Sequence, residues 1–154
     1  MSVLLTYLLM LFYLTVAVDL ETDVGGIYSG HIIELGVFAG EGMPALSQRW
    51  QIPGAVPSRA TELTGIRSAD LAGMPPVSQL PQVLTAYLQQ LHHATGQEIV
   101  LVGHNLVAFD IPSLLLEYHR QRRCMLVEFS TVGVVVVIGA QLHAFTMCCN
   151  CACV

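Results

Sequence analysis

This sequence contains no lysine and carries little charge of either sign. Its six basic side chains are all arginines, set against 11 acidic residues, so that the net charge is −5. Proteins that grip a nucleic-acid duplex along its length use many cations spread over one face. The composition therefore argues against a broad phosphate-binding surface, and any nucleic acid would have to be held locally, for example at a strand end or through metal ions.

The charges that are present lie in the middle of the chain. Residues 1–18 have no charged side chain, and Glu128 is the only charged residue after Arg123. The intervening part has the composition of an ordinary globular domain, and 154 residues are enough to enclose one sizeable core. We predict an apolar N-terminal extension (residues 1–13), a folded domain (14–123) and an apolar, cysteine-rich tail (124–154).

The apolar start of the chain allows two interpretations. A signal peptide has a basic first region, but the first basic residue is Arg49, and no small-x-small cleavage site precedes Asp19. An uncharged stretch of 18 residues is at the lower limit for a membrane span, and its last five residues are needed for a strand. We favour an extension in front of that strand. A signal or anchor segment, and with it a small membrane-associated protein, is the alternative.

The tail combines a β-branched run with crowded cysteines. Residues 132–140 read V-G-V-V-V-V-I-G-A, which suits a strand buried on both faces, and we predict a fifth strand within 131–139. Cysteine spacing typical of a structural zinc site is missing, and nothing indicates a disulfide framework. We therefore expect an intracellular protein, of the nucleus or the cytoplasm.

Apolar periodicity and turn residues predict alternating strands and helices. The predicted strands are 14–21, His31–Phe38, Ala45–Ile52 and Glu98–Val102, and the predicted helices are Arg59–Leu63 (with Ser58 as N-cap and Gly65 as stop), Val77–His93 and Ser113–Arg123. Strands first, then helices alternating with strands, predict an α/β fold with a mixed sheet flanked by helices.

Two carboxylates close the first predicted strand. Asp19 and Glu21 are two residues apart, and side chains with this spacing point to the same side of a sheet. Two such charges repel, and their burial is costly unless a positive group lies between them. We predict a divalent cation there. A third carboxylate, Asp110, follows the strand Glu98–Val102, and hard oxygen ligands of this kind suit Mg²⁺ or Mn²⁺.

Four motifs in order make the chain recognisable. D-L-E-T, H-I-I-E-L-G, P-G-A-V-P-S-R-A-T-E-L-T-G-I and G-H-N-L-V-A-F-D-I-P-S-L-L together resemble the DEDD-type 3′–5′ exonuclease family, over roughly residues 14–120. That family includes the proofreading subunit of bacterial DNA polymerase III. The resemblance implies a ribonuclease H-like fold and hydrolysis of phosphodiesters at a single-stranded 3′ end of nucleic acid by a two-metal mechanism.

The resemblance also implies roles for individual residues. Asp19 and Glu21 match the first motif, which binds two divalent ions, and Asp110 matches the carboxylate of the second motif. His104 and Asn105 match the pair that shapes the loop around the scissile nucleotide. Thr22 matches the start of the segment whose backbone holds the terminal nucleotide. No protein partner is implied.

Three departures from the family pattern affect the expected activity. The glycine after D-x-E-T comes one residue late, at Gly25, and three residues rather than two separate Asn105 from Phe109. The third motif, a His or Tyr base with an Asp four or five residues later, has no counterpart, because no acidic residue follows Glu128. We therefore expect a C-terminally incomplete domain with little or no catalysis, and a non-catalytic nucleic-acid-binding remnant is a further alternative.

Several residues also have simpler interpretations. Asp110 can act as the N-cap of its helix, either alone or in addition to binding a metal. His104 can be a buried core histidine. Glu34 is expected to be structural. The arginines near the end of the folded domain (Arg120, Arg122 and Arg123) are expected to form a solvated face rather than a phosphate clamp.

Overall fold

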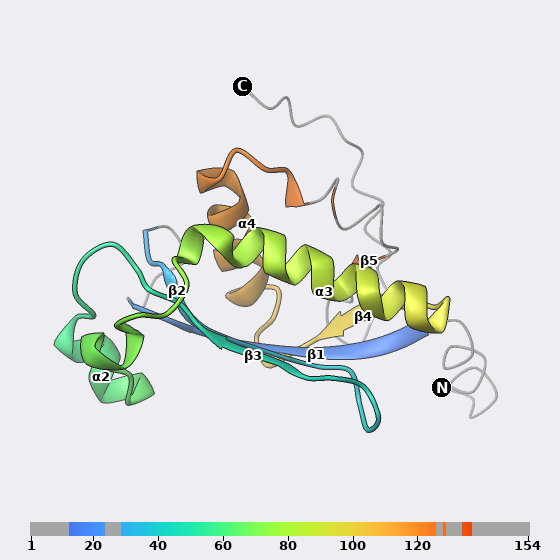
Figure 1. Ribbon diagram of the computed structural model, residues 1–154, viewed down its shortest axis with the longest axis horizontal. Coiled ribbons are helices and arrows are strands. Elements are labelled where there is room, and N and C mark those ends of the chain that lie inside the picture. The colour runs from blue at the N-terminus through green and yellow to red at the C-terminus, as the bar shows by residue number, and fades with distance from the viewer. Residues whose placement is uncertain (1–12, 24–28, 126–127, 129–133, 137–154) are drawn as a thin grey trace.

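The computed structural model describes residues 13–23, 29–125, 128 and 134–136 (Figure 1). Its elements follow in the order β1 (Tyr13–Thr22), β2 (Ile32–Phe38), β3 (Leu46–Arg49), α2 (Ser58–Thr64), the 3₁₀ turns η1 (Ser68–Leu71) and η2 (Val77–Gln79), α3 (Leu80–Thr95), β4 (Glu98–Val102), α4 (Asp110–Arg120) and β5 (Val134–Val136). The predicted strands and helices are all present, with ends shifted by up to a few residues.

The five strands form one mixed sheet in the order β3-β2-β1-β4-β5. β1 is antiparallel to β2 and parallel to β4, β3 is antiparallel to β2, and β5 is parallel to β4. The prediction of an α/β fold with a mixed sheet is confirmed. β5 falls inside the predicted range 131–139, and the rest of that range lies outside the described residues.

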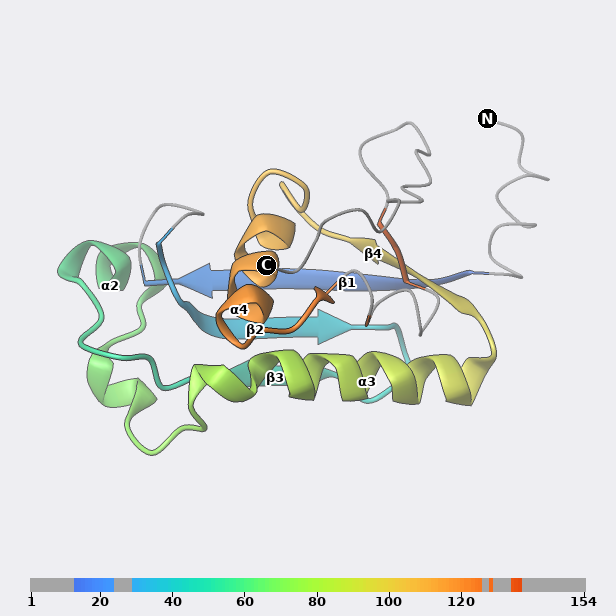
Figure 2. The ribbon, with the colours of Figure 1, turned by 90° about the horizontal axis from the view of Figure 1, so that it is seen from above.

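Helices α3 and α4 lie against the same face of this sheet (Figures 1 and 2). Burial along β1 alternates accordingly: Val16, Val18 and Leu20 are buried, whereas Ala17 and Asp19 are exposed. The hydrophobic core contains several large side chains that are fully buried; they include Trp50, Ile33, Leu84, Leu88, Leu114 and Tyr118. Because side chains alternate along a strand, every second residue of β1 faces the side that the two helices leave open.

The helix starts differ from the predicted caps. The N-cap of α2 is Pro57, with no side-chain capping bond, so the prediction of Ser58 as N-cap is wrong. Gly65 does end this helix, with the positive φ of 74° that favours glycine. At α4 the N-cap is Phe109 and Asp110 is the first helical residue, so the capping interpretation of Asp110 is wrong too. Pro57 at the start of α2 and Pro112 in the first turn of α4 are both compatible with a helix, because the N–H groups of a first helical turn have no hydrogen-bond partner within the helix.

Within the described part of the chain, no helix is both long enough and apolar enough to cross a membrane. The predicted N-terminal extension before residue 13, Gly25 of the first motif and the cysteine-rich end lie outside the described residues. The three-part division of the chain remains a prediction.

Candidate active site

Asp19 and Glu21 lie on the face of β1 that the helices leave open. Asp19 is exposed and Glu21 is half-buried, whereas Val18 and Leu20 between them point into the core. Glu21 stands directly opposite Glu34 of β2. Burial, and then the charges of Asp19 and Glu34, raise the pKa of Glu21. Carboxylates that destabilise one another's charge in this way favour a cation among them.

Glu34 also has a partner on the next strand. The Nε of Arg49 donates to Glu34 Oε1 at 3.0 Å, and the two residues are in register between β2 and β3. Glu21, Glu34 and Arg49 therefore form a row across three neighbouring strands. The ion pair agrees with a structural role for Glu34.

The chain leaves the sheet at Gly103, immediately after β4. The last pair in the β1–β4 ladder is Ala17 with Val102. A Cβ atom on Gly103 would lie 2.6 Å from the backbone oxygen of Val18, so the chain can pass this close to β1 only without a side chain. From there a short loop leads to α4, whose first residue is Asp110.

Asp110 is 2% exposed, and its pKa is raised to about 6, chiefly by this burial. The charge of Asp19 contributes to the rise, whereas hydrogen bonds from the backbone N–H groups of Asp110 itself and of Leu20, and the nearby His104, oppose it. Asp110 thus lies beside the part of β1 that carries Asp19. The N–H that it accepts belongs to a β1 residue beyond the end of the β4 ladder.

The chemistry of these three side chains fits a hard divalent cation. They supply only carboxylate oxygens, and Asp19 interacts electrostatically with both Glu21 and Asp110. Among the residues that the structure describes, however, no three His, Cys, Asp or Glu side chains are close enough to enclose an ion. Metal binding by Asp19, Glu21 and Asp110 remains a prediction.

The residues predicted to contact a nucleotide lie at separate places around these carboxylates. His104 and Asn105 are exposed, so the interpretation of His104 as a buried core histidine is wrong. Asn105 has a left-handed φ of 58°, and its carbonyl oxygen accepts the N–H groups of Ala108 and Phe109 at 3.0 Å. Thr22 is 8% exposed and lies on the opposite face of β1 from Glu21.

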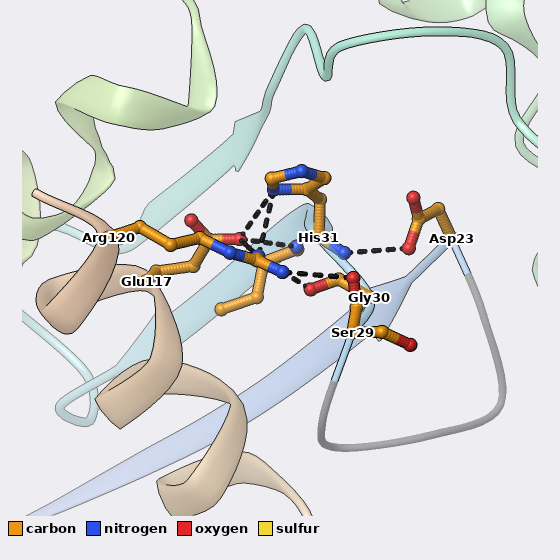
Figure 3. A network of polar contacts seen from close by, with 7 residues as sticks. Asp23, Ser29, Gly30, His31, Glu117 and Arg120 are labelled. Carbon is orange, nitrogen blue, oxygen red and sulfur yellow. Dashed lines mark hydrogen bonds and ion pairs between the residues drawn. The ribbon is translucent and has the colours of Figure 1, made fainter.

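One polar cluster near these residues was not foreseen from the sequence. Glu117 of α4 is 1% exposed and contacts His31, at the start of β2, and Arg120 (Figure 3). The expected solvated arginine face is therefore wrong for Arg120. Arg123 is half-buried and forms two hydrogen bonds to Glu128, and Arg122 is exposed. The sequence offered one indication of this cluster: Glu117 follows Asp110 by two helical turns, so the two side chains lie on the same face of the helix.

Comparison with solved structures identifies this architecture. A complex of ExoI with SSB-Ct superimposes with a TM-score of 0.67, at 10% identity and over 79% of this chain. The fold resembles part of exonuclease I. Escherichia coli exonuclease I in complex with a dT13 oligonucleotide gives a TM-score of 0.64 at 10% identity, and its zinc-bound form with single-stranded DNA gives 0.60 at 12%, each over 79% of this chain.

The match to exonuclease I confirms the resemblance to an exonuclease family at the level of the fold. This chain spans only about a quarter (27%) of each of these three exonuclease I chains. No family model matches the sequence, and no curated protein matches it.

Proposed function

We propose that this chain binds the 3′ end of a single nucleic-acid strand through divalent metal ions and hydrolyses its terminal phosphodiester slowly. Asp19, Glu21 and Asp110 would hold Mg²⁺ or Mn²⁺ through their carboxylates. The bound metal would activate water and stabilise the leaving oxygen. His104 and Asn105, exposed on the loop before Asp110, and the backbone from Thr22 onwards would contact the terminal nucleotide.

One observation carries this proposal. The carboxylate of Asp110, from a helix that begins 91 residues after Asp19, is buried against β1, where the charge of Asp19 raises its pKa. A buried carboxylate beside another of like charge is unfavourable for folding alone, and such arrangements concentrate at functional sites. The exonuclease I fold and the four sequence motifs support the same assignment.

The slow rate follows from the sequence. No acidic residue follows Glu128, so the chain lacks a counterpart of the third motif with its general base and fourth carboxylate. A positioned base contributes about 10²–10⁴-fold to a hydrolysis rate. The same absence favours the second candidate function, which is metal-dependent binding of a strand end without turnover.

A single assay separates the two functions. The full chain is incubated with a 5′-labelled single-stranded oligonucleotide and Mn²⁺, and both retention and shortening of the label are followed. Shortening from the 3′ end that disappears in Asp19→Ala establishes the nuclease, and Mn²⁺-dependent retention without shortening establishes the binding function. If the oligonucleotide is neither retained nor shortened, or if Asp19→Ala behaves as the wild type does, both are wrong.

A further inference from the structure

The cluster around Glu117 connects the two chain segments that carry the predicted metal ligands. Glu117 lies seven residues after Asp110, and both side chains are buried on the same face of α4. On the other side of the cluster, His31 directly precedes β2 and Ile32 is its first residue, opposite the end of β1 where Glu21 lies. A displacement of α4 that unseats Glu117 therefore also displaces Asp110 relative to β1.

Glu117 fastens α4 directly to the start of β2. Its Oε1 accepts the backbone N–H of Ile32 at 3.4 Å and lies 3.0 Å from the Nδ1 of His31. Arg120, one turn further along the helix, donates to the same oxygen at 2.8 Å. The other oxygen of Glu117, Oε2, is buried and has no hydrogen-bond partner within the described residues.

Arg120 extends this connection to the turn between β1 and β2. Its Nη1 donates to the carbonyl oxygen of Gly30 at 2.7 Å, and its Nη2 donates to that of Ser29 at 2.9 Å (Figure 3). From the β1 side, Asp23 accepts the backbone N–H of His31 at 2.6 Å and donates its own N–H to the carbonyl of His31 at 3.0 Å. The start of β2 is thus held by β1 and by α4 at the same time.

A buried ionic cluster is an expensive way to attach a helix to a sheet. Removing a carboxylate from water costs free energy that pairing with Arg120 only partly returns, and apolar packing of similar volume does as well or better. Such clusters are best accounted for where they fix one arrangement rather than add stability. The arrangement fixed here is the position of α4 against the ends of β1 and β2.

We propose that Glu117 is a positioning residue for the metal site, which holds Asp110 in place beside Asp19 and Glu21 through its contacts with Arg120 and the start of β2. This inference rests on the proposed function. Substitution of residues that hold metal ligands in position without binding the metal themselves lowers metal affinity by about 10–100-fold. The charge of Glu117 and the planar fork of Arg120 are both required for this role.

Two readouts on the full chain test this role. Isothermal titration measures the dissociation constant for Mn²⁺, and hydrogen exchange in metal-free protein measures protection of the amides of His31 and Ile32. We expect Glu117→Gln to raise the dissociation constant about tenfold and to accelerate exchange at these amides. Arg120→Ala should do the same, and Arg120→Lys should have an intermediate effect. The matched control is Glu62→Gln, which breaks an exposed pair of the same spacing with Arg59 on α2 and should change neither readout.

The outcomes separate this inference from the proposed function. Mn²⁺ binding that depends on Asp19 but stays within twofold of wild type in both Glu117→Gln and Arg120→Ala overturns the positioning role alone. A wild-type chain that binds no Mn²⁺, or binds it equally well after Asp19→Ala, overturns the proposed function and this role with it. Should Glu117→Gln not fold, the two Arg120 variants decide, because the Arg120 side chain is 24% exposed, against 1% for Glu117, and its substitution leaves a smaller defect in the core.

Discussion

Asp110 is almost inaccessible to solvent, yet it is largely ionised at neutral pH, since its pKa is about 6. The pKa in the folded chain is above the ordinary value of 3.8, because burial disfavours the charged form. The folded state therefore binds the additional proton between about pH 4 and about pH 6, and the free energy of unfolding falls as the pH rises through this window. Above about pH 6, the full decrease in the free energy of unfolding has taken place.

We predict that Asp110→Asn stabilises the metal-free chain at pH 7.5, by roughly 1–3 kcal/mol, and has little effect at pH 4. The amide is neutral at both values, and its oxygen still accepts the N–H of Leu20. Urea denaturation at the two pH values measures the difference. The same variant should bind Mn²⁺ more weakly, because one anionic ligand is lost. Equal free energies of unfolding for the two proteins at pH 7.5 would contradict the assigned burial of this charge.

At the scale of elements, the chain passes close to β1 directly after the end of β4, at Gly103. We predict that Gly103→Ala lowers the free energy of unfolding by about 1–3 kcal/mol, because the added Cβ would meet the carbonyl oxygen of Val18 at 2.6 Å. Gly36→Ala in β2 is the matched control. Its Cβ would lie 3.8 Å from the carbonyl oxygen of Asp19, an ordinary contact, so no loss is expected. Thermal unfolding of both variants compares them, and equal melting temperatures would be evidence against the close approach.

The elements themselves were predictable because their residues follow simple periods. Apolar side chains at helical spacing identified α3, and alternating or continuous apolar runs identified β1, β2 and β4. The sequence also predicted a strand inside 131–139, where β5 pairs with β4. Helix starts were less predictable: Ser58 has the right chemistry for a cap, but the backbone places Pro57 in that position.

The cluster around Glu117 was not predictable from local pattern. Glu117 and His31 are 86 residues apart in the sequence, and a glutamate on an amphipathic helix is ordinarily on the solvated side. Nothing local distinguishes Arg120, which is bound to the turn before β2, from Arg122, which is exposed. The carboxylates were different, because D-x-E-T and H-N-x-x-x-F-D are specific enough as motifs to bring Asp19 and Asp110 together before any coordinates are known.

For the whole molecule, charge is the property that governs how a nucleic acid is held. Five of the six arginines form ion pairs with acidic side chains, namely Arg49, Arg59, Arg67, Arg120 and Arg123. The affinity of a protein for a single strand falls as salt rises. The slope of log affinity against log salt is about −0.7 for each phosphate that the protein neutralises. Because few cations are available to neutralise phosphates, the contribution of counterion release is small.

We predict that the affinity for a single strand depends weakly on salt. With Mn²⁺ held constant, the slope of log affinity against log salt should be no steeper than about −1.5 between about 50 and 200 mM. Fluorescence anisotropy of a labelled oligothymidine measures it. A slope of about −4 or steeper would mean that many arginines leave their acidic partners to bind phosphate.

The parallel pairing of β1 with β4 has a consequence for how the chain acquires its structure. β1 and β2 are close in sequence and can pair early. The other edge of β1 can pair only once Glu98–Val102, more than 80 residues further along, has been made. Pairings that close such long loops form slowly. A nascent chain that ends before β4 would expose the long, apolar edge of β1 to other chains. We therefore expect fragments that end there to aggregate rather than fold.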